Sequence, residues 1–313
     1  MIIKKTAISG VFWTALDSIV LKGGLFIATI IIARIIGPDQ FGLIGMISVL
    51  ISVGNAIVDG GFQSSLIRTL DTDDSDYSSV FFLNIVSSLV LMVLLYFIAP
   101  SVAVFYNQPI LVSVIRVYSF IFLLTGLCSV QMALFNKQLE FKKIMLFNIP
   151  ATIVAIVVGL AMAFCDYGVW SVVALYLSYQ IVLTVLLWFY SSWKPSLLLS
   201  VAKMKRHFRF GYKLLVSSII TTVFSNIYNI IIGKSFPVST LGHYERASSF
   251  NQYPVSVLTG IVLKVFYPLL ANLQNDKERI SQVFRFIIQT VFLFVAPLML
   301  GAAAIAKPLF LLV

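Results

Sequence analysis

Long apolar segments recur along the whole chain and are separated by short polar segments. Many of them reach the length of about 20 residues that an α-helix needs to cross a membrane. Their apolar residues run continuously and do not alternate with polar ones, which favours helices over the strands of a membrane β-barrel. A helix also satisfies its own backbone hydrogen bonds within lipid. The pattern therefore predicts an all-α integral membrane protein.

The apolar segments predict about nine transmembrane helices. Gly37-Pro38 and Asn107-Gln108-Pro109 are expected to break two of the hairpins. The connections are short, so no loop is large enough to fold as a separate domain. The expected spans are residues 8–36, 40–66, 78–100, 109–135, 143–165, 168–190, 212–234, 246–271 and 281–306.

Composition agrees with this pattern, because 60% of the residues are hydrophobic, 11% are charged and the mean hydropathy is +1.00. Soluble domains are about a quarter charged. The first apolar segment is longer than a signal-peptide core and lacks a small-residue cleavage motif, so we expect it to remain in the chain. Cys128 and Cys165 lie in apolar segments with no CxxC motif. We expect no disulfide, metal site or cofactor.

Lys and Arg are distributed unevenly between the two sides of the expected spans. Fifteen lie on the side of the N-terminus, and four lie on the other side, namely Arg34, Lys234, Arg246 and Lys307. Cytoplasmic loops carry the excess of positive charge in membrane proteins. The N-terminus is therefore expected to be cytoplasmic.

Two charged runs, the acidic residues 71–76 and the basic residues 203–213, fall on the cytoplasmic side. We interpret the acidic run as a solvated turn and the basic run as a linker before a helix. His207 and His243 are both expected in loops. The basic run is expected to meet anionic membrane lipids, and no nucleic-acid partner is expected.

An internal repeat relates the two ends of the chain with an offset of about 200 residues. IIIARIIGPDQFGLI, from Ile30, aligns with IIIGKSFPVSTLGHY, from Ile230, and Gly42 falls on Gly242. Six expected spans separate the copies, so both have the same orientation, as in parallel-repeat transporters. This predicts a six-helix N-terminal lobe, residues 1–200, and the first three helices of a C-terminal lobe, residues 201–313. On this interpretation the chain is a fragment or a truncated product.

Charged residues inside the expected spans are candidate functional residues, because a charge at the bilayer centre costs about 2.5–3.5 kcal/mol. The cations are Lys22, Arg116 and Lys264, which suit a cleft that holds a diphosphate. Arg116 and Lys264 also lie near enough to span ends to extend to the membrane surface instead. Lys22 lies near the middle of its span.

The intramembrane acids are Asp17 and Asp59. Both are candidates for coupling transport to H⁺ or Na⁺, and helix–helix pairing is the alternative. On a regular helix Asp17 and Lys22 point about 140° apart, so they are poorly placed to pair with each other. Asp59 precedes Gly60-Gly61, where it would cap a kink.

The segments GPDQFGLI, VDGGFQSSLIR and FRFGYKLLVSS, followed by GKSFPVSTLGHYERASSF, resemble Wzx-type polysaccharide flippases of the MOP (multidrug/oligosaccharidyl-lipid/polysaccharide) superfamily. The resemblance covers essentially the whole chain. It implies that an undecaprenyl-diphosphate-linked oligosaccharide (an O-antigen, capsule or exopolysaccharide repeat unit) crosses the bacterial inner membrane by alternating access. It also implies contact with the polysaccharide polymerase machinery. The family usually has twelve to fourteen helices, so this chain departs from its pattern.

The resemblance adds an expectation about the site. In related flippases a cationic cavity binds the diphosphate, and the first and eighth helices flank a lateral portal. This implies diphosphate contacts for Lys22 and Lys264, which lie on those two helices, with Arg116 as a third contact.

Two other classes remain open. A drug/cation antiporter of the same superfamily would place acids, rather than lysines, in its cleft. A membrane glycan polymerase or glycosyltransferase would need a sizeable extramembrane loop with paired acids, and the outer loops here are short. Because the sequence also lacks a P-loop, HExxH or GxSxG motif, we predict a transporter and not an enzyme.

Overall fold

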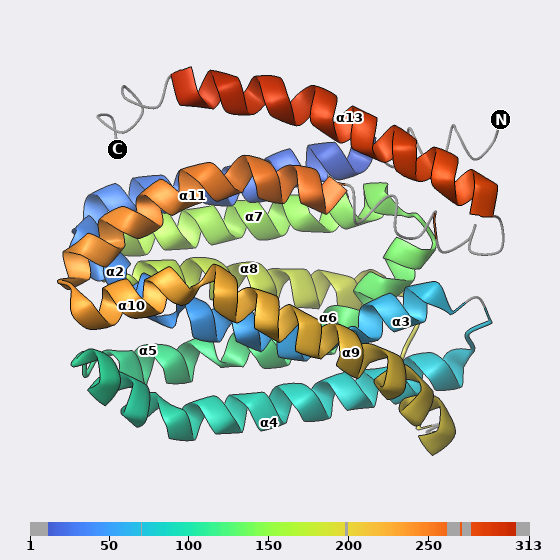
Figure 1. Cartoon of the computed structure of the whole chain (residues 1–313). Coiled ribbons are helices and arrows are strands. Elements are labelled where there is room, and N and C mark those ends of the chain that lie inside the picture. The colour runs from blue at the N-terminus through green and yellow to red at the C-terminus, as the bar shows by residue number, and fades with distance from the viewer. Residues whose placement is uncertain (1–11, 70, 198–199, 262–269, 271–276, 305–313) are drawn as a thin grey trace.

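The computed structural model describes residues 12–69, 71–197, 200–261, 270 and 277–304. These residues form helices, with no strand among them (Figure 1). The helices are η1 (Ile19–Gly23, a π-helix), α2 (Gly24–Asp59), α3 (Phe62–Arg68), α4 (Asp74–Tyr106), α5 (Leu111–Tyr118), α6 (Phe120–Lys137), α7 (Phe141–Phe164), α8 (Val169–Tyr190), α9 (Val201–Ser225), α10 (Ile227–Ser235), α11 (Val238–Ile261) and α13 (Lys277–Ala304).

Six helical stretches of the described part are long and apolar enough to cross a membrane, and the bent pair α9–α10 is a seventh candidate. The first stretch runs for 57 residues, from Phe12 to Arg68, and contains the second expected span and residues 12–36 of the first. The eighth expected span, 246–271, extends beyond the described residues. The prediction of an all-α, multi-pass membrane protein is confirmed, and the number of nine spans stays a prediction.

The breaks predicted at Gly37-Pro38 and Asn107-Gln108-Pro109 are confirmed. Gly37 has φ 81° and ψ 168° inside α2, a backbone conformation that glycine adopts readily. Pro38 follows it and suits the first turn of the next helical limb. Figure 1 shows that the second limb of α2 runs in the opposite direction to the first. In the second break, Asn107 with φ 54° ends α4 before α5 begins at Leu111.

The N-terminal helices share buried apolar cores. Small residues of α7, such as Ala155 and Ala163, pack with Ile32 of α2 and Leu175 of α8, because small side chains let membrane helices approach closely. Many large apolar side chains elsewhere are exposed, such as Phe97 on α4. Such exposure is expected where outer helix faces meet lipid.

The helices α2 and α11 cross at very short range. A Cβ atom added to Gly42 would overlap the carbonyl oxygen of Val238, and one added to Gly242 would overlap the carbonyl oxygen of Pro38. Leu241, the residue before Gly242 on α11, is fully buried and joins the core formed by α2, α4, α5, α6 and α8. This crossing attaches α11 to the N-terminal helices and positions the cavities described below.

We expect Gly242→Ala to destabilise the protein by about 1–3 kcal/mol, because the added methyl group forces two backbones apart. The measurement is the thermal unfolding midpoint of the purified protein in detergent. Gly301→Ala is the matched control, since nothing lies within 4 Å of a Cβ at that position of α13, and alanine is the better helix former. Equal midpoints for Gly242→Ala and Gly301→Ala would contradict the tight crossing.

Candidate functional site

A cavity of about 330 Å³ lies between η1, both limbs of α2, α8 and α11. We call it the cationic cavity, because Lys22 and Arg246 are the charged residues among the described residues that line it. Its other lining residues are Leu25, Phe26, Thr29, Ile30, Ala33, Phe41, Tyr176, Ser249, Phe250 and Gln252. The cavity thus places two positive charges, from opposite ends of the sequence, in a largely apolar surrounding.

Lys22 reaches this cavity from η1, the five-residue π-helix at Ile19–Gly23. A π-turn holds one residue more than an α-turn, so it changes the direction in which the following side chains point. Such turns often occur at functional sites. Lys22 was predicted as a functional residue from its place within an apolar span, and the structure places it on the cavity wall.

Arg246 is a candidate that the sequence analysis missed, because it was placed beyond the membrane on the outer side. The helix α11 begins at Val238, eight residues before Arg246, so Arg246 lies two turns inside the helix. Its guanidinium donates a hydrogen bond to the carbonyl oxygen of Ala33. The guanidinium carbon also lies 5.9 Å from the ring centroid of Phe41. If the start of a helix had been recognised at the turn FPVST, residues 236–240, Arg246 would have been placed two turns inside that helix.

A second cavity, of about 190 Å³, lies beside the first and is lined by polar residues and one tyrosine. Its lining residues are Ser48, Ser52, Ser225, Asn226, Asn229, Tyr244, Glu245, Ser248, Ser249 and Gln252. We call it the polar cavity. Ser249 and Gln252 line both cavities, so the two form neighbouring compartments of one site.

Arg116 is not among the residues that line either cavity. Lys264 lies outside the described residues. Arg116 lies at the contact of α5 with α4, where its guanidinium carbon is 4.1 Å from the ring centroid of Tyr96. Its Nε donates to the carbonyl oxygen of Tyr96 at 3.4 Å. Diphosphate contacts for both residues stay predictions.

The two predicted acids have different surroundings. Asp17 is 2% exposed, and its Oδ1 accepts a hydrogen bond from Nδ2 of Asn148 on α7 at 2.6 Å. The hydroxyl of Tyr179 on α8 donates to Oδ1 of the same asparagine at 2.9 Å. Asp59 is exposed at the end of α2, next to Gly60 and Gly61, both of which have positive φ. Asp17 is therefore the better enclosed of the two.

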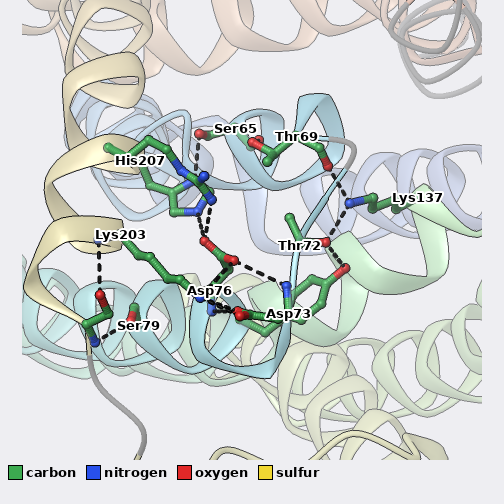
Figure 2. A network of polar contacts seen from close by, with 12 residues as sticks. Ser65, Thr69, Thr72, Asp73, Asp76, Ser79, Lys137, Lys203 and His207 are labelled. Atoms are coloured by element: carbon green, nitrogen blue, oxygen red, sulfur yellow. Dashed lines mark hydrogen bonds and ion pairs between the residues drawn. The ribbon is translucent and has the colours of Figure 1, made fainter.

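A network of polar contacts joins the start of α4 to the start of α9 (Figure 2). Its centre is Asp76, which is 2% exposed. Arg206 Nη2 lies 2.5 Å from Asp76 Oδ1, and Lys203 Nζ lies 3.4 Å from Oδ2. His207 Nε2 donates to Oδ1 at 3.1 Å, and His207 Nδ1 lies 2.8 Å from the hydroxyl of Ser65 on α3. We call these five residues the Asp76 network.

Asp73 caps α4 next to this network. Its Oδ1 accepts from the backbone N–H of Asp76, and Asp76 Oδ2 accepts from the backbone N–H of Asp73, which is a capping box. The ammonium of Lys203 lies 2.5 Å from Asp73. This hydrogen bond, together with the N–H of Asp76, holds the pKa of Asp73 well below its usual range.

The interpretation of these charged runs as a solvated turn and a linker was wrong for Asp76 and His207. Asp76 is buried in the first turn of α4, and His207 is 0% exposed within α9. His243 also lies in a helix, α11, where it is exposed. Arg206, Lys203 and His207 contact the carboxylate of Asp76, which allows Asp76 and His207 to be buried while most other residues of the two runs stay exposed. No group of side chains suited to a metal ion occurs among the described residues.

The fold and the site define a class: an all-α, multi-pass membrane protein with a charged cavity between packed helices. Residues 31–313 match the family described as Polysaccharide biosynthesis protein, and the chain belongs to this family. The resemblance seen in the sequence is thereby confirmed. No solved structure matches the chain significantly.

Three of the curated relatives that it matches are similar along nearly all of its length. It is 24% identical over 309 residues to the lipopolysaccharide biosynthesis protein WzxC of Escherichia coli, with 98% of this chain and 63% of that protein covered. It is 24% identical over 304 residues to the succinoglycan biosynthesis transport protein ExoT of Rhizobium meliloti, with 97% and 62% covered. The teichuronic acid biosynthesis protein TuaB of Bacillus subtilis is 25% identical over 324 residues, with 97% and 63% covered. The chain thus spans just under two thirds of the length of these relatives.

Proposed function

We propose that this chain moves an undecaprenyl-diphosphate-linked oligosaccharide from the inner to the outer leaflet of a bacterial cytoplasmic membrane. The observation that carries the proposal is the cationic cavity, in which Lys22 and Arg246 line one space between α2 and α11. Membership of a polysaccharide biosynthesis family supports it. The names of the relatives, which refer to lipopolysaccharide, succinoglycan transport and teichuronic acid, agree with a role in surface glycans.

The chemistry of the cavity suits a diphosphate. A diphosphate carries about two negative charges, and an ammonium and a guanidinium offset them through charge-assisted hydrogen bonds. The guanidinium offers a planar pair of donors that matches two phosphate oxygens, and the ammonium acts as a point charge. The apolar walls lower the local dielectric constant, which strengthens both interactions. Lys264 and Arg116 are proposed as further contacts.

The proposed mechanism is alternating access by two lobes, residues 1–200 and 201–313, with the N-terminus in the cytoplasm. The contacts at the crossing of α2 and α11 support the lobe assignment. Gly42 meets Val238 and Gly242 meets Pro38, and each pair becomes the other when residue numbers are shifted by 200. Two parallel repeats related by an axis along the membrane normal would make such reciprocal contacts.

The test is lipid transfer in liposomes that contain the purified chain and a fluorescent undecaprenyl-diphosphate-linked oligosaccharide. A membrane-impermeant quencher first removes the signal of the outer leaflet. We expect the remaining signal to decay faster than in protein-free liposomes as the lipid is moved outward. Equal decay in both preparations would refute transport by this chain. Transfer of the glycan to another acceptor would instead indicate an enzyme.

We propose Asp17 and Asp59 as sites that couple transport to H⁺ or Na⁺. Asp17 is the stronger candidate, because it is buried and Asn148 holds its carboxylate. Asp17→Asn keeps the shape and removes the charge, so we expect transport by this variant to lose most of its dependence on an ion gradient. The measurement is the transfer rate with and without an imposed gradient, with Asp59→Asn compared in parallel. Full gradient dependence in the double variant would exclude both residues.

A further inference from the structure

The polar cavity differs from the cationic cavity in charge and composition. Among the described residues that line it, Glu245 alone is charged, and serine, asparagine and glutamine side chains supply most of the remaining wall. Arg246, the next residue along α11, lines the neighbouring cavity instead. Successive residues of one helix thus divide the site into a positive and a negative compartment.

The carboxylate of Glu245 is held by neutral donors. Its Oε1 accepts a hydrogen bond from Nδ2 of Asn229 at 2.5 Å, and the same amide donates to the hydroxyl of Ser48 at 2.7 Å. Asn229 is 8% exposed, so α2, α10 and α11 fix this group between them. A carboxylate has about four lone-pair positions, and the amide of Asn229 occupies one of those on Glu245.

This compartment suits neutral hydroxyl groups better than phosphate. A phosphate beside Glu245 would meet a like charge, and the described wall residues include no lysine or arginine to offset it. The hydroxyls of a sugar can donate to the carboxylate and exchange hydrogen bonds with the serine and amide groups. The ring of Tyr244 adds an apolar surface at the wall. Hydrogen bonds to a charged group are among the stronger ones in proteins.

We infer that the polar cavity binds the sugar joined directly to the diphosphate, and that Glu245 and Asn229 determine which sugar is accepted. The inference rests on the proposed function, in which the diphosphate lies at Lys22 and Arg246. Ser249 and Gln252 line both cavities, so the two cavities adjoin each other. This matches the lipid, in which the first sugar is bonded directly to the diphosphate. A pocket that hydrogen-bonds hydroxyl groups discriminates strongly against ligands that lack them.

The test compares the affinities of the purified 313-residue chain for undecaprenyl diphosphate alone and for the same lipid carrying one glucose, galactose or N-acetylglucosamine. We expect at least one sugar to tighten binding about tenfold. Glu245→Gln and Ser52→Ala are single variants that make small changes in the cavity wall. Each should reduce this gain to about twofold or less. The affinity for the sugar-free lipid should not fall, because neither variant removes a group that binds the diphosphate. Glu278→Gln, on the exposed surface of α13, is the matched control and should keep the tenfold gain.

Two results would overturn the sugar site: a wild-type chain that binds all four lipids equally, or an undiminished gain in Glu245→Gln. An unchanged gain together with an altered response to Na⁺ would identify a cation site instead.

Lys22→Ala separates this inference from the proposed function, since it should weaken binding of sugar-free and sugar-bearing lipids equally. If Lys22→Ala left both affinities unchanged, the diphosphate site would fail. Unfolding midpoints of all variants would establish that each one folds.

Discussion

Replacing Lys22 and Arg246 together by alanine is expected to weaken binding of undecaprenyl diphosphate by at least about 100-fold. A hydrogen bond to a charged group contributes about 1.5–3 kcal/mol, and about 1.4 kcal/mol is a tenfold change in affinity. Each single variant should therefore lose about tenfold or more. The measurement is equilibrium binding of the lipid to the purified chain in detergent at fixed salt concentration.

Lys142→Ala is the control for this loss of charge. Lys142 is exposed and lies 5.4 Å from the ring of Trp13, away from the residues that line the cavity. The control should bind the lipid as the wild type does. Wild-type affinity in the double variant would contradict the assignment of the cationic cavity to the diphosphate, and an equal loss in Lys142→Ala would indicate unspecific attraction.

Asp76→Ala is expected to lower the free energy of unfolding by about 3 kcal/mol. When both members of an ion pair are buried, removing one leaves the other charge unpaired, which costs about 3–5 kcal/mol. Arg206 and Lys203 are 51% and 27% exposed, so water recovers part of this cost. His207, which is 0% exposed, loses its acceptor completely. The thermal unfolding midpoint in detergent should fall by several degrees.

Asp74→Ala is the matched control, because Asp74 lies in the same first turn of α4 but is exposed. Its removal should cost less than about 1 kcal/mol, the usual contribution of an acid at a helix N-terminus. If both variants unfolded at the same temperature, the Asp76 network would contribute nothing specific to the packing of α9 on α3 and α4.

The helices were predictable because lipid makes their signal strong. Backbone groups in the membrane must bond within a helix, and long apolar segments therefore have one regular solution. The turns at Gly37-Pro38 and Asn107 were also predictable, since these residues adopt or impose backbone angles that end a helix. Lys22 was found for a related reason, because a charge within an apolar span is costly.

Arg246 and the Asp76 network were missed because they depend on contacts between distant segments. Hydropathy marks the apolar part of a helix but not its polar first turns, so the start of α11 at Val238 was not recognised. His207 was assigned to water because its neighbours in sequence are charged, whereas its partners Asp76 and Ser65 belong to other helices. Two runs of opposite charge on one side of the membrane were the available signal for this pairing.

The measurement that tests the central claim most directly is the leaflet distribution of lipid-linked oligosaccharide in cells that depend on this chain. Cells with the wild-type chain should carry the oligosaccharide on the outer leaflet, and cells with Lys22→Ala should retain it on the inner leaflet. Cells with Lys142→Ala should resemble the wild type. An outward distribution that is the same with Lys22→Ala and Arg246→Ala as with the wild type would contradict transport through the cationic cavity.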